Sequence, residues 1–255
     1  MGSIRIGGRE PSLLRLGDME AYEAYAGDER VWPGTETKLW LHLTSKTSVT
    51  LYYDGLLAII PYMIDWGDGK SETYSGYSRT HAYAGAGDYV VRVRPTGNGI
   101  RPFGYGTLNY YNIFGIGAGG TKTGTSPELT RLEIGGLAGN INSWAFAGCT
   151  SLRAVTVPGH VQSLGDEAFK GCAGLALAEI GAHRLGADVV KSCPALQKLW
   201  LRESVETIGA DSLRDIGPTG ALTIYCEADE KPTSWPEGWN PGGFPVVWGQ
   251  KARPW

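Results

Sequence analysis

Three stretches of the sequence can be laid over one another: WAFAGCTSLRAVTVPG from Trp144, EAFKGCAGLALAEIGA from Glu167 and DVVKSCPALQKLWLRE from Asp188. Their cysteines, Cys149, Cys172 and Cys193, recur at spacings of 23 and 21 residues. A period in the low twenties indicates a stacked repeat array, in which no unit buries its own apolar face and each neighbour covers the next.

The apolar residues of these units coincide in three registers, and the third register consists of pairs that predict short strands. The fold class expected is mainly β, with a leucine-rich-repeat solenoid of short strands and short helical turns over residues 129–226. The registers are Phe146, Phe169, Val190 and Leu213; then Leu152, Leu175 and Leu196; then Leu132/Ile134, Val155/Val157, Ala178/Ile180, Leu199/Leu201 and Leu222/Ile224.

The amino-acid sequence of the units resembles the BspA-like leucine-rich repeats of bacterial surface and phage-associated proteins. Such a unit reads as a strand, a V-x-x-I-G turn and A-F-x-G-C-x-x-L, found here as VQSLGDEAFKGCAGL from Val161 and more loosely as VETIGADSL from Val205. The segment Ile224–Gly249 is similar to the part that closes such arrays. This resemblance implies a C-terminal cap over residues 227–255, in which Trp235, Trp239 and Trp248 cover the last repeat.

The repeating cysteines are expected to point into the solenoid as small apolar fillers, because free cysteine is among the most buried residue types. A disulfide pair or a metal site is the alternative, although the sequence has no C-x-x-C element and no histidine beside the thiols. Cys226 lies outside the repeat register. His160 and His183 occupy equivalent repeat positions and are interpreted as solvated loop residues or, alternatively, as ligands.

Residues 34–95 carry a second pattern, in which alternating apolar residues predict half-buried strands around LWLHLTS, SVTLYYDG and DYVVRVRP. Between them lie IDWGDG from Ile64 and THAYAGAGDYVVRV from Thr80. This combination resembles a polycystic kidney disease (PKD) domain, a small immunoglobulin-like β-sandwich. We expect Gly67, Asp68 and Gly69 to form a tight hairpin turn, and Trp66 to fill the gap between sheets.

Three aspartates of this region raise the alternative of a calcium site, because carboxylates near turns bind hard cations. They are Asp65, Asp68 and Asp88. In the PKD family the aspartate of W-G-D-G chiefly forms the turn, and the spacing here lacks the ligand periodicity of a calcium loop. No metal and no cofactor is therefore predicted.

Residues 1–33 contain two Gly-Asp steps, which predict a β-hairpin extension too small to fold unaided. The wording resembles the amino-terminal segment of phage and prophage tail-associated proteins, which implies a virion-anchoring role. The alternative is an edge hairpin on the sandwich. The resemblance depends on Leu16, Gly17, Asp18, Tyr25, Gly27, Asp28, Val31, Trp32 and Pro33.

Residues 96–128 are rich in glycine and aromatic residues and are expected to connect the two parts and cap the first repeat. Alternatively, the tyrosines form a sugar-stacking platform. The residues concerned are Phe103, Tyr105, Tyr110, Tyr111 and Phe114.

Composition and motifs exclude several classes of function. The formal net charge of −3 gives no indication of a basic surface that would bind nucleic acid. The beginning MGSIRIGGRE has no apolar stretch after a basic start, and no run approaches the roughly 20 apolar residues that span a bilayer. No catalytic motif is present, and GIGAGGTKTG from Gly115 misses the spacing of a phosphate loop. The sequence therefore predicts neither an enzyme nor membrane insertion.

These patterns together predict a non-enzymatic phage virion protein, assembled in the host cytoplasm and present in multiple copies or as a homo-oligomer. Its first residues would bind other virion proteins, and the repeats would bind a host surface polysaccharide or protein. The alternatives are a capsid or tail decoration protein without a receptor, and a bacterial surface adhesin or carbohydrate-binding protein. Candidate partner-binding residues are Trp200, Glu133, Thr156, Glu179 and Thr223 on the strands, with Tyr105, Tyr110 and Tyr111. Trp200 is the preferred anchor, although packing against the neighbouring module or another subunit is its alternative role.

Overall fold

The computed structural model describes residues 15–16, 19–20, 24–26, 29–32, 36–52, 62–75, 78–95, 115–117, 128–135, 140–209, 211–217 and 222–255. In this part of the chain every regular element is a strand, and none is a helix. The molecule is mainly β, as expected, with a β-solenoid over the repeat region. The short helical turns expected between the repeat strands are wrong for the described residues.

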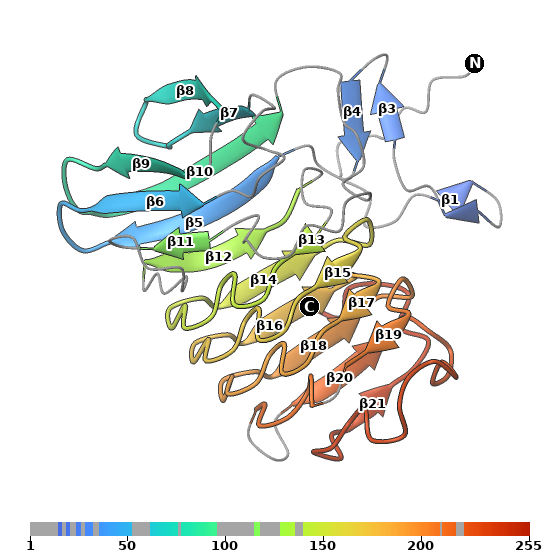
Figure 1. Ribbon diagram of the computed structural model, residues 1–255. Helices are drawn as coiled ribbons and strands as arrows, with labels where there is room; N and C mark the ends of the chain where they lie inside the picture. Colours follow the sequence, from blue (N-terminus) through green and yellow to red (C-terminus); the bar gives the residue numbers. More distant parts are fainter. Residues whose placement is uncertain are drawn as a thin grey trace.

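One ten-stranded sheet runs through the molecule in the order β21-β20-β18-β16-β14-β12-β5-β10-β7-β8 (Figure 1). The repeat strands from β12 to β21 pair in parallel, and the remaining strands pair antiparallel. The strands are β5 (Thr37–Leu43), β7 (Tyr62–Asp65), β8 (Ser71–Tyr74), β10 (Gly87–Pro95), β12 (Leu129–Glu133), β14 (Ala154–Val157), β16 (Leu177–Ile180), β18 (Lys198–Leu201), β20 (Thr223–Cys226) and β21 (Val246–Val247).

The repeat strands keep the predicted register until the last unit. Leu132, Val155, Ala178 and Leu199 follow one another along the sheet and are all buried. In β20, however, Ile224 pairs with Leu199 and Cys226 with Leu201. The pair Leu222/Ile224 therefore lies two residues out of frame. The buried pair of this unit is Ile224/Cys226.

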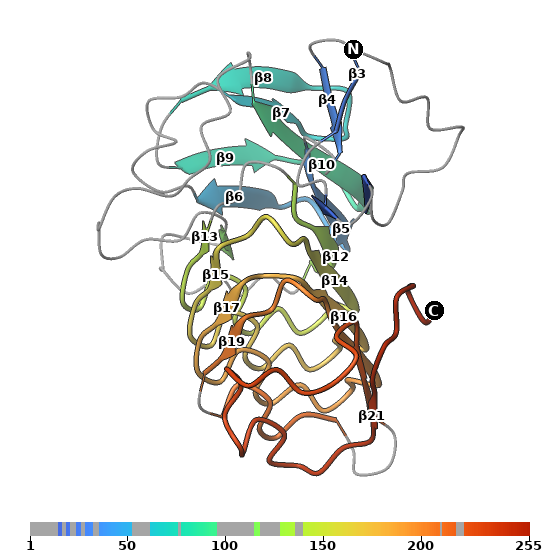
Figure 2. The same cartoon turned by 90° about the vertical axis from the view of Figure 1, so that its right-hand side faces the viewer.

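A second, four-stranded parallel sheet lies on the other side of the solenoid, and pattern analysis missed it. Its two-residue strands are β13 (Asn140–Ile141), β15 (Ser163–Leu164), β17 (Arg184–Leu185) and β19 (Thr207–Ile208). Strands β15 and β19 occupy the two segments interpreted as V-x-x-I-G turns, those that begin at Val161 and Val205. The units that begin with β12, β14, β16 and β18 thus each contribute one strand to each of the two sheets (Figure 2).

The segment after each short strand is a run of consecutive turns rather than a helix. In the first unit alternate amides bond within the unit, as Ala147 N does to Trp144 O, and to the next unit, as Phe146 N does to Ala168 O. The turns begin at non-glycine residues with positive φ, a conformation that costs free energy in isolation. These residues are Trp144 (φ 60°), Glu167 (φ 57°), Asp188 (φ 54°) and Asp211 (φ 55°). Bonds between units replace the bonds of a helix and hold this backbone in place.

The close stacking of the units predicts that Gly186→Ala is strongly destabilising. A Cβ at Gly186 would lie 2.6 Å from Asp166 N and 2.8 Å from Gly165 C, both backbone atoms of the preceding unit. We expect a loss of about 2 kcal/mol or more in the free energy of unfolding, measured by denaturant titration. Gly238→Ala is the control, because a Cβ there meets nothing within 4 Å. Equal stability of the two variants would contradict the stacking.

The antiparallel half of the sheet is accompanied by a three-stranded sheet in the order β11-β6-β9. Its strands are β6 (Ser48–Tyr52), β9 (Ser78–Ala82) and β11 (Gly115–Gly117). The predicted alternation of β5 is confirmed, since Leu39, Leu41 and Leu43 are buried.

The W-G-D-G segment forms the turn that the sequence predicts. Gly67 and Gly69 have φ of 77° and 86°, between the paired strands β7 and β8. Trp66 is only 1% exposed, and the hydroxyl of Tyr83 donates to its carbonyl oxygen at 2.9 Å. The turn and the buried tryptophan are therefore confirmed.

Two hairpins precede β5, as expected from the two Gly-Asp steps. Strand β1 (Arg15–Leu16) pairs antiparallel with β2 (Met19–Glu20), and β3 (Ala24–Ala26) pairs antiparallel with β4 (Glu29–Trp32). The Gly-Asp steps between these strands lie outside the described residues.

The two halves of the molecule are joined by the pairing of β5 with β12. These strands run antiparallel, with Leu132 opposite Leu39 and Glu133 opposite Lys38. The buried side chains of the repeats and of the antiparallel strands form a single hydrophobic cluster. The first edge of the solenoid sheet is thus covered by β5. Of the connector expected to cap the repeats, the structure describes only β11 and Glu128.

Tryptophan rings pack together at the far end of the solenoid. The ring centroids of Trp235 and Trp239 are 4.9 Å apart, and Trp248 lies 6.1 Å from Trp235. The indole nitrogen of Trp235 donates to Val205 O at 3.1 Å, which ties this cluster to the last units.

A fragment of residues 96–255, which lacks β5, is predicted to associate with itself. Its strand β12 would present unpaired backbone groups and the uncovered side chain of Leu132, and such edges are templates for pairing between chains. We expect concentration-dependent oligomers in light scattering, whereas the full chain serves as the control. A folded, monomeric fragment at the same concentrations would contradict the role given to β5.

Candidate functional site

The face of the ten-stranded sheet turned away from the core carries one continuous row of side chains. Strand pairing places them in register from the antiparallel half to the last repeats, and we call them the outer row. In spatial order they are Asp65, Arg92, Lys38, Glu133, Thr156, Glu179, Trp200 and Tyr225.

The half of this row on β10, β5 and β12 is partly exposed and carries charges of both signs, Arg92, Lys38 and Glu133. Lys38 Nζ lies 3.7 Å from Glu36 Oε1 and 4.0 Å from Glu133 Oε2. Arg92 Nη1 lies 3.8 Å from Asp65 Oδ2. Such partly exposed pairs add little stability, so this surface remains available to a partner at small cost.

An aromatic platform lies beside these charges. Trp40 is half-buried on β5, and the guanidinium carbon of Arg131 is 4.7 Å from the centroid of its ring. Tryptophan and arginine are the residue types most enriched among the anchors of protein interfaces. We call Trp40, Arg131, Lys38, Glu133 and Arg92 the open patch.

The other half of the row is covered by residues 250–255, which we call the strap. In Figures 1 and 2 the chain returns from β21 along the outside of the solenoid strands. The indole nitrogen of Trp200 donates to Gln250 O at 3.2 Å, and the ring of Trp255 lies edge-on at 6.4 Å. Trp200 is consequently only 1% exposed.

Trp200 therefore cannot be the exposed anchor that the sequence predicted. Its side chain is on the outer row, but the strap buries it, so that its alternative role of packing is the one observed. Thr223 is also misplaced, because the residue in register with Trp200 is Tyr225, and Thr223 pairs with Lys198. Thr223 is displaced because the last unit is two residues longer than the repeat pattern predicts, whereas Trp200 is buried by the strap, which the pattern does not cover.

The remaining strand candidates lie on the outer row, but in different surroundings. Glu133 belongs to the open patch, whereas Thr156 and Glu179 contact Arg253 of the strap. Tyr105, Tyr110, Tyr111, Asp18 and Asp28 lie outside the described residues. Leu16, Tyr25 and Trp32 fall on β1, β3 and β4.

Pattern analysis missed Trp144 as a surface residue. Its side chain is 50% exposed, and its indole nitrogen donates to Glu167 Oε2 at 2.8 Å. The equivalent positions hold the acids Glu167, Asp188 and Asp211, each paired with a base three residues later. The aligned repeat sequences do contain the feature that could have revealed it, because Trp144 occupies a position that is acidic in the other units.

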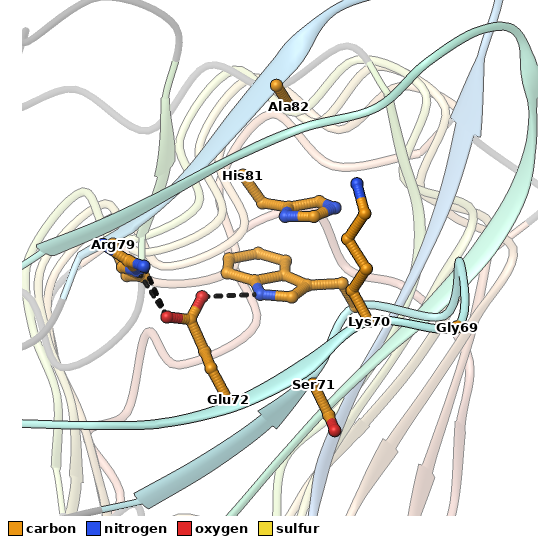
Figure 3. Close-up of a pocket in the computed structure, with 8 residues that line it drawn as sticks. Gly69, Lys70, Ser71, Glu72, Arg79, His81 and Ala82 are labelled. Atoms are coloured by element: carbon orange, nitrogen blue, oxygen red, sulfur yellow. Dashed lines mark hydrogen bonds and ion pairs between the residues drawn. The ribbon is translucent and has the colours of Figure 1, made fainter.

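A hollow beside β8 and β9 gathers charged side chains around the buried Trp66 (Figure 3). The ring of His81 stacks on Trp66 with centroids 4.6 Å apart, and its Nε2 lies 2.9 Å from Asp68 Oδ2. Glu72 accepts hydrogen bonds from Trp66 Nε1 at 3.0 Å and from Arg79 Nε at 2.8 Å. The polar groups of the hollow thus satisfy one another and fix the turn.

Two carboxyl groups have lowered pKa values here, that of Glu72 in the hollow and that of Asp68 beside it. The hydrogen bond from Arg79 is the main cause for Glu72, whose pKa lies below its usual 4.5. For Asp68, burial raises the pKa, but the bonds with His81 and the Lys70 amide outweigh burial, so that its pKa is also lowered.

Glu72→Gln is predicted to weaken the acid dependence of stability. Because the pKa of Glu72 is lower in the folded chain than in the unfolded chain, its contribution is present above about pH 4.5 and is lost as pH falls through the folded pKa. The variant should therefore be less stable than the wild type at neutral pH, and this difference should shrink in acid. Denaturant titrations at several pH values measure it, with the exposed Glu230→Gln as control. A difference that does not change with pH would contradict the assignment.

The thiols are structural, as the sequence predicted. All four cysteines are buried and none is in a disulfide, and Cys172 and Cys193 donate to Phe146 O and Phe169 O, each at 3.2 Å. The hydrogen bond with Cys193, together with burial, raises the pKa of Cys172 far above its ordinary value. Burial also raises the pKa of Cys226 to about 12. Thiols with such raised pKa values are protonated and unreactive.

Within the described residues, no group of three histidine, cysteine, aspartate or glutamate side chains is arranged to hold a metal ion. The three aspartates considered for calcium have separate partners: Asp65 accepts from Gly67 N, Asp68 contacts His81 and Asp88 contacts His42. His160 and His183 also have different partners, Gly135 O and Glu206.

Comparison with known proteins identifies the repeats. A family model described as a BspA type leucine-rich repeat region matches residues 124–226 in six copies. No curated protein and no solved structure matches the chain. The repeat region is compatible with a surface or adhesion-type protein. Among the residues that the structure describes, there is no helix of the length and apolarity needed to cross a membrane.

Proposed function

We propose that the chain is a non-enzymatic adhesion protein that binds a partner through the open patch. The BspA type repeats support this class, and the continuous outer face supports the location. The observation that carries the proposal is the stacked pair of Trp40 and Arg131, which stands among partly exposed charges. An aromatic face with polar neighbours suits both the apolar side of a sugar ring and a protein surface.

The rigidity of the sheet favours binding at the open patch. The patch lies on β10, β5 and β12, and each of these strands is paired on both sides. The buried residues of the same strands belong to the hydrophobic core. The backbone of such strands is already ordered before binding, which reduces the cost of association. Several copies on one particle or cell would add avidity.

A more specific proposal concerns the setting of the protein. The sequence of residues 1–33 supports a phage virion protein that is anchored to the particle by these residues. The W-G-D-G turn with buried Trp66 supports a PKD-like module between this anchor and the repeats. The structure contributes the two hairpins to this proposal. Electron microscopy of particles labelled with an antibody to the repeats would test the virion setting, since unlabelled particles would overturn it.

The open patch predicts that Trp40→Ala and Arg131→Ala each weaken binding about tenfold or more, as expected for interface anchors. The full chain, displayed on beads to supply avidity, would be titrated against bacterial cells and a panel of their envelope polysaccharides. Arg184→Ala is the matched control, because Arg184 is exposed on β17 in the other sheet.

Saturable binding that both patch variants reduce and Arg184→Ala preserves would support the proposal. The absence of saturable binding by the bead-displayed chain would overturn the adhesion role and favour a decoration protein. Binding that the patch variants leave unchanged would place the site elsewhere, and Trp144→Ala would then be compared.

A further inference from the structure

The strap is attached at one end through the backbone. Gly249 N bonds to Ala228 O at 2.8 Å, and Gln250 N bonds to Cys226 O at 2.9 Å. Beyond Gln250, the printed sequence Lys-Ala-Arg-Pro-Trp crosses the outer face of β20, β18, β16 and β14, and side chains make the contacts. A segment held in this way opens at lower free energy than the strands beneath it.

The strands provide a built site for the guanidinium group of Arg253. Its Nε donates to Glu179 Oε2 at 3.0 Å, and its Nη2 donates to Thr156 Oγ1 at 3.3 Å. With the strap in place the side chain of Glu179 is only 6% exposed, and Arg202 Nη1 donates to its other oxygen, Oε1, at 2.8 Å. Burial of a carboxylate with a single cation in place makes it a strong acceptor for a second cation.

An aromatic site lies next to the site for Arg253. The ring of Trp255 meets the edges or faces of Trp200 and Tyr225, with centroids 6.4 Å away in both cases. Lys198 Nζ lies 5.9 Å from the same ring. The guanidinium carbon of Arg202 lies over the ring of Trp200, 4.7 Å from its centroid.

The receptor residues all belong to paired strands or their ends, so strand pairing rather than the strap fixes the positions of their backbones. Glu179 and Trp200 are in register on β16 and β18, and Arg202 is held by Glu227 Oε2 at 2.9 Å as well as by Glu179. Every copy of the chain therefore carries both a groove and a segment that fits it. Exchange of an identical segment between copies is a low-cost route to association.

We propose that the outer face of β14, β16, β18 and β20 is a peptide-binding groove for an Arg-Pro-Trp segment, and that the strap of a second copy of this chain can occupy it. In the single chain its own strap fills the groove. In the crowded setting of neighbouring copies, the same contacts link one copy to the next. This inference stands apart from the open patch, because it concerns other residues and a different partner.

The first test is binding of a fluorescent peptide with the sequence of residues 248–255 to the full chain. The variant Arg253→Ala/Trp255→Ala frees the groove, so we expect saturable binding at least tenfold tighter than to the wild-type chain, measured by anisotropy. Adding Glu179→Gln to this variant should abolish the gain. If this triple variant does not fold, Thr156→Val tests the same contact from a neighbouring strand.

The second test mixes two full-length chains with complementary defects. One chain carries Arg253→Ala/Trp255→Ala and keeps a groove, and the other carries Glu179→Gln and keeps a strap. We expect a mixed dimer in size-exclusion chromatography with light scattering, and no dimer from either chain alone. No peptide binding to a folded groove variant, or no mixed dimer well above the peptide Kd, would overturn the proposal.

Discussion

The backbone pairing of β5 with β12 is the interaction on which the rest of the structure depends. A solenoid exposes strand edges and apolar surface at its ends, and both need cover. Here an antiparallel strand supplies that cover at the first end, with Leu39 opposite Leu132. The pairing also extends the outer face across both halves, which is why the open patch contains residues from the two halves together.

Each repeat also depends on its neighbour for its internal hydrogen bonds and packing. Because a unit donates its alternate amides to the next unit, the backbone between the sheets is satisfied without a helix. Phe146 and Phe169 stack with centroids 5.4 Å apart, and the cysteine thiols fill the space beside them. The tryptophans Trp235, Trp239 and Trp248 gather at the end opposite to β5.

Much of this architecture could be predicted from the sequence, because burial repeats with the period of the fold. The buried residues of β12 to β18, the buried thiols and the W-G-D-G turn all follow from local patterns. The two-residue strands of the second sheet were missed, since two residues are too few for a periodic signal. The burial of Trp200 was missed because it depends on Gln250, about 50 residues away, which no repeat predicts. The shift at β20 was missed because the last unit is longer, with Ile224 25 residues after its partner Leu199, whereas Leu199 follows Ala178 by 21.

The outer face links the fold to the proposed roles through one continuous sheet. Its covered half, on β14 to β20, supports the proposed association between copies. Its open patch supports the proposed adhesion role and needs the two halves to behave as one body. Amide hydrogen exchange of the full chain tests this claim most directly. The account predicts that the slowest amides of β5, β10, β12 and β16 open with the same free energy, as one cooperative unit. Opening of β5 and β10 at a free energy lower by about 2 kcal/mol or more, while β16 stays protected, would contradict it.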